Sequence, residues 1–431
     1  MYPNFQGIHS MNKILKVFST IVISLFVLSI FGWMVFHISE EDKNFGVLEK
    51  PVTFMYTFPD LFSQSIEEVK TLPPTFLPTP EDFTPVNRLD TDVIVLSTYT
   101  ESRNKRTIEL LNLRNDSVLY SWTVKNPFTE EMRVLNPLML DHKSLVYSID
   151  GFTGLIRIDS LGNQVWEQDS MHAHHSLNPD SEGNLWICSF EKGWSANGNY
   201  RVDDIDFFIK DNYITKIDVN TGEVLFNKSV IAILKENRLE NYLLKTAAMK
   251  DPLHINDVEP ALKTTKYYIE GDVFISVKNL SMIFQYRPST NQVIRIIEGP
   301  FVGQHDVDFL DENTLVLFNN NRHEVHLRQS LLPPEDSSRL TYAGDFFSQV
   351  LSYDLKTGAF DFIGDSVFRA NEIFTGTEGL QQFIGPDTYL VEEQNSGVIW
   401  IIKEDEVVLK KVLASEHKGY HHLPNWIRVI N

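Results

Sequence analysis

The chain has 431 residues, 42% of them hydrophobic, and a formal net charge of −20. This length accommodates either two or three ordinary domains or one large all-β domain with a sizeable core. The acidic balance argues against a nucleic-acid partner, because binding to phosphate backbones requires concentrated Lys and Arg. The single cysteine, Cys188, excludes an intrachain disulfide and a cysteine-based zinc site.

The N-terminal region contains a long apolar stretch at residues 17–38, "VFSTIVISLFVLSIFGWMVFHI", which has no Asp, Glu, Lys or Arg. It is long enough to cross a bilayer core of about 30 Å and predicts one transmembrane signal anchor. Two lysines precede it and three acidic residues follow it, so the positive-inside rule predicts that residues 1–16 are cytoplasmic and that the rest is extracytoplasmic, in the periplasm or outside the cell. A cleaved signal peptide is the alternative, although the run is long and lacks a clear small-x-small cleavage site.

Residues 39–89 are interpreted as an extracytoplasmic spacer between this anchor and the domain that follows. The prolines of "LPPTFLPTPEDFTP" (residues 72–85) are incompatible with a continuous helix or a central strand. The segment is therefore expected to separate the anchor from the folded domain.

From residue 90 to residue 431 the pattern is almost wholly β, and it repeats. Six stretches alternate apolar and polar residues around a polar turn, which is typical of an antiparallel hairpin with one buried face. These stretches are residues 107–122, 154–167, 213–227, 282–296, 349–363 and 397–412.

Each hairpin follows a short, more apolar strand, which is expected to be the innermost strand of its repeat. These strands are residues 92–98, 144–149, 184–189, 272–277, 314–318 and 388–393. One inner strand and an outer hairpin, repeated six times, predict a six-bladed β-propeller. The spacing exceeds the typical ~40–50 residues per blade and implies insertions, one of which, near residues 229–249, has a helical pattern. A pair of two-sheet sandwiches is the alternative, but it does not explain the sixfold recurrence.

Histidine recurs before the inner strands of the third, fourth and fifth repeats, in "HAHHSLNPDSEGN", "DPLHINDVEP" and "QHDVDFLDEN". Segments that enter the inner strands of a propeller emerge on one face around its axis. His174 or His175, His254 and His305 are therefore predicted to converge on one pocket. A single loop histidine is usually structural, whereas three at equivalent repeat positions favour a functional site.

These motifs resemble those of a known family. In order, "HHSLNPDSEGN", "DPLHINDVE", "SVKNLSMIF" and "GQHDVDFLDENTLVLFNNN" are similar to successive motifs of the arylsulfotransferases, over most of the chain after residue 90. The resemblance implies a six-bladed propeller that moves a sulfuryl group from an aryl sulfate donor to a phenolic acceptor through a sulfohistidine, without a nucleotide donor, cofactor or metal. It also implies that His305 is the nucleophile, with His254 and either His174 or His175 around the transferred group.

The chain departs from the family pattern at Lys278, where the S-x-R-N motif usually has arginine. Lysine supplies charge but not the planar bidentate fork, so the exchange is not conservative. Asn256 and Asn279 are the nearby polar candidates for substrate binding. Asp306 is a candidate to accept a hydrogen bond from the second nitrogen of His305 or from nearby backbone.

Two functional classes follow from these observations. The first is a membrane-anchored sulfotransferase, and the second is a non-catalytic propeller that binds a ligand or protein partners. Lys278 discriminates between them, because an inactive relative is expected to lose such a residue before it loses its fold. A metal hydrolase is less favoured because the histidines lack a compact H-x-x-x-H arrangement, and no feature supports a quinone-dependent dehydrogenase.

Overall fold

The computed structural model describes residues 6–39, 45–48, 50–55, 72–102, 105–125, 133–149, 154–191, 198–202, 205–246, 248, 251–322 and 347–430. The chain divides into two compact units, Met1–Leu72 and Pro73–Asn431.

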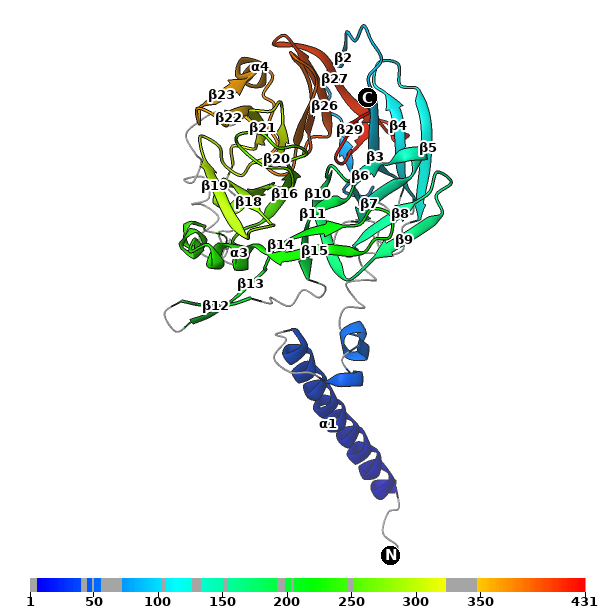
Figure 1. Ribbon diagram of the computed structural model, residues 1–431. Helices are drawn as coiled ribbons and strands as arrows, with labels where there is room; N and C mark the ends of the chain where they lie inside the picture. The colour runs from blue at the N-terminus through cyan, green and yellow to red at the C-terminus, as the bar shows by residue number, and fades with distance from the viewer. Residues whose placement is uncertain are drawn as a thin grey trace, which may run out of the picture. The chain divides into compact units, whose positions relative to one another are not determined.

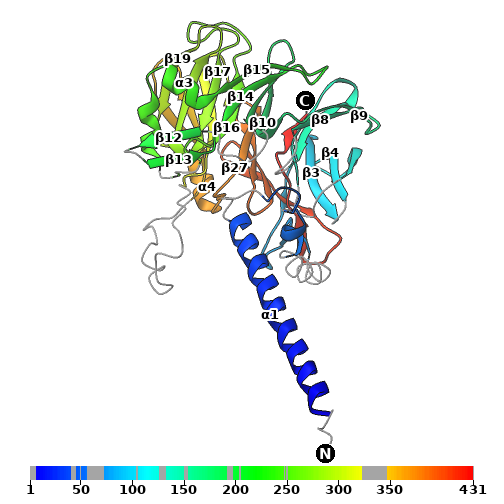
Figure 2. The same cartoon turned by 90° about the horizontal axis from the view of Figure 1, so that it is seen from below.

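The first unit contains one long helix, α1 (Gln6–Ser39), followed by the short 3-10 helix η1 (Gly46–Leu48). Figure 2 shows α1 as one continuous helix. Its segment Lys16–Ile38 spans 23 residues with a mean hydropathy of 2.4, and it is the one helix among the described residues that is long and apolar enough to cross a membrane. This length and composition suit a membrane anchor and a signal sequence equally.

The second unit is an all-β propeller built from antiparallel sheets (Figure 1). Within the described ranges, five sheets have four strands each. In order from axis to rim they are β29 (Arg428–Val429), β3 (Ile94–Ser102), β4 (Lys105–Asn112) and β5 (Val118–Lys125); β6 (Val134–Met139), β7 (Leu145–Ile149), β8 (Leu155–Ile158) and β9 (Gln164–Gln168); β10 (Met171–Pro179), β11 (Leu185–Glu191), β14 (Tyr213–Ile217) and β15 (Val224–Ser229); β16 (Ile255–Pro260), β17 (Val273–Val277), β18 (Met282–Arg287) and β19 (Gln292–Glu298); and β20 (His305–Phe309), β21 (Thr314–Asn319), β22 (Gln349–Asp354) and β23 (Phe360–Ile363). A separate two-stranded hairpin consists of β12 (Gly198–Val202) and β13 (Ile205–Ile209).

The remaining large sheet has seven strands. The meander β24 (Leu380–Gly385), β25 (Thr388–Glu393), β26 (Val398–Lys403) and β27 (Glu406–Ala414) is extended by β28 (Tyr420–His422), β1 (Phe76–Pro78) and β2 (Val86–Asn87). The structure thus has five blades of the regular four-stranded form where the repeat count predicted six, because the last predicted repeat is part of this larger sheet. Strands β1 and β2 lie inside the predicted spacer at residues 39–89 and pair with β28 and β27, so the compact unit begins earlier than expected, at Pro73.

The order of strands within the blades corrects one expectation. The apolar strands predicted to be innermost, such as β11, β17 and β21, are second in their sheets. The first strands are β10, β16 and β20, where the sequence pattern predicts loops, and Figure 1 shows them near the middle of the propeller. Strand β16 contacts both β10 and β20, so these strands line the axis. They escaped detection because bulges and polar residues interrupt the alternation that identifies a strand.

The C-terminal strand closes the ring. Strand β29 pairs with β3, with Arg428 opposite Leu96, and it also contacts β24 of the seven-stranded sheet. The carboxyl end thus completes the first blade.

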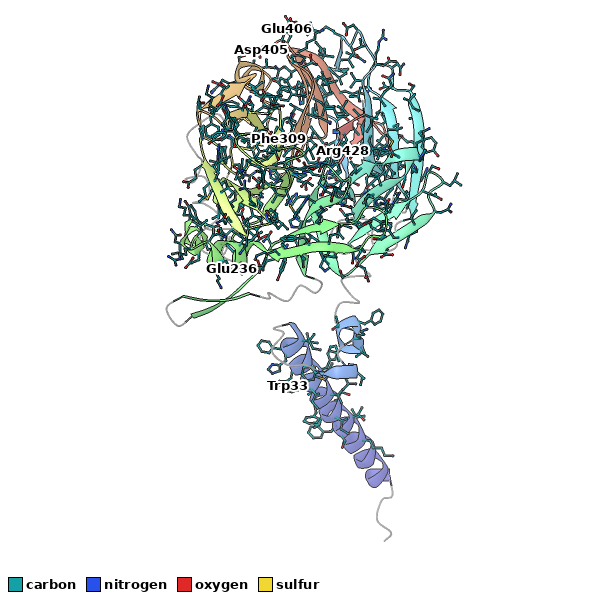
Figure 3. All side chains as sticks on the ribbon, viewed as in Figure 1. Trp33, Glu236, Phe309, Asp405, Glu406 and Arg428 are labelled. Atoms are coloured by element: carbon teal, nitrogen blue, oxygen red, sulfur yellow. The ribbon has the colours of Figure 1, made fainter. Side chains whose placement is uncertain are left out.

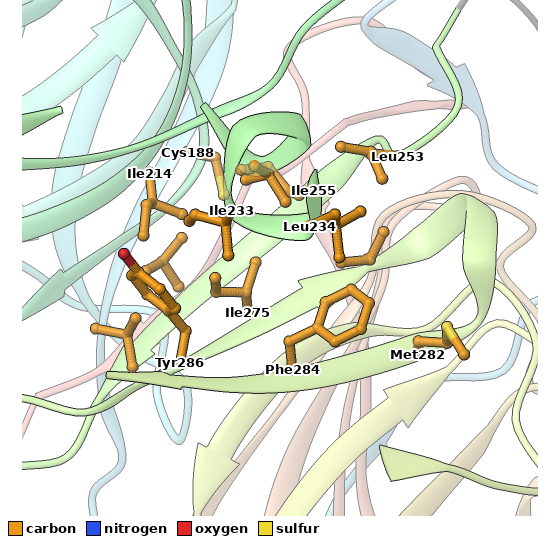
Figure 4. Close-up of a cluster of buried hydrophobic side chains, with 14 of the residues drawn as sticks. Cys188, Ile214, Ile233, Leu234, Leu253, Ile255, Ile275, Met282, Phe284 and Tyr286 are labelled. Atoms are coloured by element: carbon orange, nitrogen blue, oxygen red, sulfur yellow. The ribbon is translucent and has the colours of Figure 1, made fainter. Parts of the chain in front are cut away.

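The core lies between the faces of neighbouring blades. Figure 4 shows the cluster between the third and fourth blades, where Ile214 and Cys188 pack with Phe284 and Tyr286 under the helical insertion. That insertion consists of α3 (Val230–Glu236) and η3 (Glu240–Lys245), and the Ser229 hydroxyl caps α3 by accepting from the backbone of Ala232 at 2.9 Å. The other short helices are η2 (Asp141–Lys143), η4 (Lys278–Leu280) and α4 (Asp365–Ala370).

Candidate active site

The three axial strands β10, β16 and β20 are each irregular where the histidines lie. Their pairing shifts between His174 and Leu177, between Ile255 and Asp257, and between His305 and Asp308. The left-handed region is occupied by His175 (φ 57°), His254 (φ 47°) and Asp306 (φ 53°), a conformation that non-glycine residues adopt rarely. Bulges of this kind re-aim side chains out of the alternating pattern of a strand.

The bulges bring one histidine from each of three blades together. Nε2 of His175 lies 3.2 Å from Nε2 of His254. The ring centroid of His175 is 5.3 Å from that of His254 and 5.7 Å from that of His305. His175 therefore contacts both of the other two.

His174 occupies a different position. Its ring stacks on Phe190 with centroids 4.0 Å apart and an interplanar angle of 3°, and its centroid is 6.2 Å from that of His254. Nζ of Lys210 lies 3.4 Å from the Phe190 ring centroid. Of the two adjacent candidates, His175 contacts the other histidines directly, whereas His174 packs beside them.

His305 is almost completely buried, with 1% of its surface exposed. Its Nδ1 lies 2.5 Å from Oδ1 of Asn320, and the Asn320 amide nitrogen donates to the carbonyls of Thr375 at 2.9 Å and Glu378 at 2.6 Å. Because these two carbonyls fix the amide orientation, its oxygen faces the histidine and accepts a proton from Nδ1. The lone pair of His305 then resides on Nε2.

Electrostatics keep His305 neutral. Burial lowers its pKa to about 3, and the charge of Lys278 acts in the same direction. The pKa of His175 lies well below its usual value for the same leading reason, with contributions from the neighbouring histidines and Lys278.

Lys278 is the first residue of η4 and is 4% exposed. Its backbone N–H donates to the His254 carbonyl at 3.1 Å, which ties η4 to the histidine segment. The Asn279 side chain donates to the Asp251 carbonyl at 2.7 Å. Asn256 donates to the Gln304 carbonyl at 2.7 Å, while its buried Oδ1 has no hydrogen-bond partner among the described residues.

Asp251 is a site residue that the sequence motifs did not predict. Its Oδ2 lies 2.8 Å from Nδ1 of His254, and its Oδ1 accepts from the His254 backbone at 3.1 Å and from the Asn212 side chain at 3.0 Å. Burial alone raises the pKa of Asp251, but the hydrogen bond and charge of His254 outweigh burial and hold this pKa well below its usual range. The carboxylate three residues before the histidine in "DPLHIND" was the available signal.

A family model described as arylsulfotransferase (ASST) matches residues 136–412, which is more than half of the chain. The chain belongs to the arylsulfotransferase family. The matched region contains His175, His254, Lys278 and His305, so the residues singled out by the resemblance are those that the structure gathers at the axis.

Comparison with other proteins adds little to this family assignment. No curated protein matches the chain. Similar solved structures include a protein of unknown function from Bacteroides caccae (10% identity, 79% of this chain and 99% of that one, TM-score 0.48) and TolB from Acinetobacter baumannii (12%, 81% and 67%, 0.43). Virginiamycin B lyase from Staphylococcus aureus is also similar (11%, 80% and 88%, 0.40). All three scores are below 0.5.

Asp306 follows the residue that the arylsulfotransferase resemblance makes the nucleophile, but its carboxylate is not the partner of His305 Nδ1. Its Oδ2 accepts from the backbone of Gln381 at 2.9 Å, and the Gln381 side chain donates to the Asp306 carbonyl at 2.8 Å. Of the two roles considered for Asp306, the structure shows the hydrogen bond to backbone. Asn320, and not Asp306, is the partner of His305 Nδ1.

Asp306 belongs to a group of acids on the axial strands, the axial carboxylates, defined as Asp257, Glu259, Asp306 and Asp308. Burial raises the pKa of each, to about 6 for Asp257 and about 7 for Asp308, and repulsion from neighbouring carboxylates adds to the rise for Glu259, Asp306 and Asp308. Arg428 supplies the opposing charge, and Figure 3 shows it in the middle of the propeller. Its guanidinium also donates to the Leu177 carbonyl at 2.9 Å.

Neither the histidines nor the axial carboxylates form a recognisable metal site. In the part of the chain that the structure describes, no group of three or more His, Cys, Asp or Glu side chains has an arrangement suited to holding a metal ion.

Proposed function

We propose that this chain is a membrane-anchored aryl sulfotransferase that transfers a sulfuryl group from an aryl sulfate to a phenol through a sulfohistidine at His305, without a nucleotide. The observation that carries the proposal is the hydrogen bond between His305 Nδ1 and Asn320, which leaves a neutral Nε2 as the nucleophile beside two further histidines and Lys278.

The reaction has two balanced halves. In the first, the lone pair of His305 Nε2 forms an N–S bond while the bond from sulfur to the aryl oxygen breaks, and this oxygen takes a proton from a neighbouring group of the site so that the phenol departs. In the second, the oxygen of the acceptor phenol attacks the same sulfur and gives its proton back to that group, and the N–S bond breaks to regenerate neutral His305. Covalent catalysis of this kind replaces one difficult transfer by two easier ones.

The remaining groups stabilise the transferred oxygens and align the two phenols. Lys278 supplies a cation, and its charge, which lowers the pKa of His305, supports a role beside the nucleophile. The buried Oδ1 of Asn256 offers an acceptor close to the histidines in the chain. His174, Asn279 and Asp306 support the backbone and walls of the site through the contacts described above.

The proposal extends to the whole chain. Residues 1–16 are assigned to the cytoplasm, residues 17–38 to a transmembrane anchor, and the propeller to the extracytoplasmic side, supported by the lysines before the apolar segment and the acidic residues after it. We count the meander β24–β27 as the sixth blade of the ring.

Intact-mass analysis of the full-length protein in detergent, after incubation with 4-nitrophenyl sulfate, tests this function. An added mass of about 80 Da that discharges onto added phenol is expected from a sulfohistidine. The adduct should be absent from His305→Ala and present in His417→Ala, which removes an exposed histidine. A folded protein that forms no adduct across a panel of aryl sulfates would instead support a non-catalytic binding platform.

A further inference from the structure

Resting on the proposed function, we infer that Asp251 is a positioning residue that makes His254 the proton donor to the departing phenol, and that the enzyme therefore accepts aryl sulfates of ordinary, unactivated phenols. Such phenols have pKa values of about 10 and leave more readily when their oxygen is protonated.

Asp251 is held rigidly in front of His254. One carboxylate oxygen takes two hydrogen bonds, from Asn212 at 3.0 Å and from the His254 backbone at 3.1 Å, and the other faces His254 Nδ1 at 2.8 Å. The Asn279 side chain and the η4 backbone bind the carbonyls on either side of this turn. The carboxylate therefore fixes the imidazole ring with Nδ1–H pointing toward it.

The opposite nitrogen of His254 faces the site. Its Nε2 is 3.2 Å from Nε2 of His175, a distance at which one proton lies between the two rings. His254 is the member of this pair that can carry positive charge, because only it has a carboxylate partner and 24% of its side chain is exposed. His175 is buried among other positive or potentially positive groups. An imidazolium that arises here is centred on His254.

In this proposal His254 donates the proton in the first half of the reaction and accepts one in the second. When His305 Nε2 bonds to sulfur and the S–O bond breaks, the aryl oxygen takes the proton from His254 Nε2. When the acceptor attacks, its phenolic proton passes to His254 Nε2 as the N–S bond breaks. Asp251 keeps its charge throughout and stabilises the imidazolium, as an orienting carboxylate does in other His–Asp pairs.

His305 and His254 are distinguished by their Nδ1 partners. A neutral amide oxygen holds His305, and a carboxylate holds His254. The amide fixes a tautomer without strongly favouring the cation, whereas the carboxylate favours it. The two histidines thus suit nucleophilic attack and proton transfer respectively.

The test compares two donors in single-turnover sulfation of the full-length protein in detergent. 4-Nitrophenyl sulfate releases a stable phenolate that needs no proton, whereas phenyl sulfate releases a basic one. For Asp251→Asn we expect the rate with phenyl sulfate to fall by about 100-fold and the rate with 4-nitrophenyl sulfate by less than about tenfold. Asp251→Glu should restore part of the difference. The control Asp211→Asn removes a carboxylate that accepts from Ser229 and should affect neither rate.

Three outcomes would overturn the inference. One is an equal loss with both donors in folded Asp251→Asn, which indicates a purely structural role. Another is a sulfation rate of the unmodified protein that falls steeply as the basicity of the leaving phenol rises, a result that does not depend on the folding of any variant. The third is a His254→Gln variant whose sulfation rate falls by the same factor with both donors. If 4-nitrophenyl sulfate gives no adduct with the unmodified protein, the proposed function itself fails, whereas an adduct without donor discrimination removes only the role of Asp251.

Discussion

The proposed function gives Lys278 two roles that a substitution separates. In the proposed reaction its ammonium donates a charged hydrogen bond to a sulfate oxygen, a contribution of roughly 1.5–3 kcal/mol. Its charge also disfavours protonation of His305. The family's usual arginine grips sulfate with a planar fork, and lysine retains the charge without that geometry.

Replacing Lys278 with methionine should therefore raise the KM for the donor by tenfold or more, which is about 1.4 kcal/mol. It should also move the acid limb of the sulfation rate to higher pH. The pKa of His305 is about 3, so the nucleophile loses its lone pair only as the pH falls toward that value, and removing a nearby cation raises this pKa. The measurement is the pH profile of single-turnover sulfation. Lys278→Arg is the matched control and should leave the acid limb of the profile at the same pH. If the acid limb does not move in Lys278→Met, the charge of Lys278 does not act on His305.

At the scale of secondary-structure elements, the outer strands were predictable and the axial strands were not. Residues 213–227 and 349–363 alternate around Asp- and Gly-containing turns, and they form β14–β15 and β22–β23. Strand β20, "HDVDF", has one bulge and two acids, so its composition is that of a loop. The bulges and polar residues that shape the candidate site are the same features that conceal these strands in the sequence pattern.

The site was predictable to the same extent. His254 and His305 stand out because they recur at equivalent positions in the repeats. The choice between His174 and His175 depended on a bulge that the sequence does not mark. Asn320 follows β21, away from the QHD motif, and it is defined as a partner only by the pairing of β20 with β21.

Packing between blades is expected to dominate the stability of individual elements. Phe284 on β18 is 1% exposed and lies in the cluster between the third and fourth blades. Phe284→Ala should lower the free energy of unfolding by about 3–5 kcal/mol, because a large cavity replaces the ring. Chemical denaturation of the full-length protein in detergent measures this. Phe362→Ala removes the same side chain from β23, where it is 47% exposed, and should cost less than about 1 kcal/mol. Similar costs at both positions would contradict the assignment of the core.

At the scale of the whole molecule, buried acids should make the propeller less stable as the pH rises from about 4 through neutrality. Burial raises the pKa of Asp308, Glu392 and Glu393 to about 7, compared with about 4 in an unfolded chain. Between these values the folded state binds more protons than the unfolded state, so stability falls with increasing pH. The buried His305 and His422, with pKa values of about 3 and 4, oppose this trend only up to about pH 6.5, where unfolded histidine loses its proton.

The expected result is a decrease of about 1–2 kcal/mol in the free energy of unfolding between pH 6.5 and pH 8. Denaturation midpoints of the full-length protein in detergent across this range measure it. Glu392→Gln should flatten the dependence, whereas Glu312→Gln, at an exposed ion pair with Lys263, should leave it unchanged. A midpoint that rises from pH 6.5 to pH 8 would show that the carboxylates are ionised in the folded state.

The pairing of β29 with β3 constrains how the protein is made. Strand β3 is synthesised early, but its partner leaves the ribosome only after all the intervening blades. Until then the first blade lacks its axial strand, and the axial carboxylates lack the guanidinium of Arg428. The nascent chain therefore cannot complete its ring during translation, and a nonsense mutation just upstream of Trp426 would yield an open, protease-sensitive product even though nearly every blade had been translated.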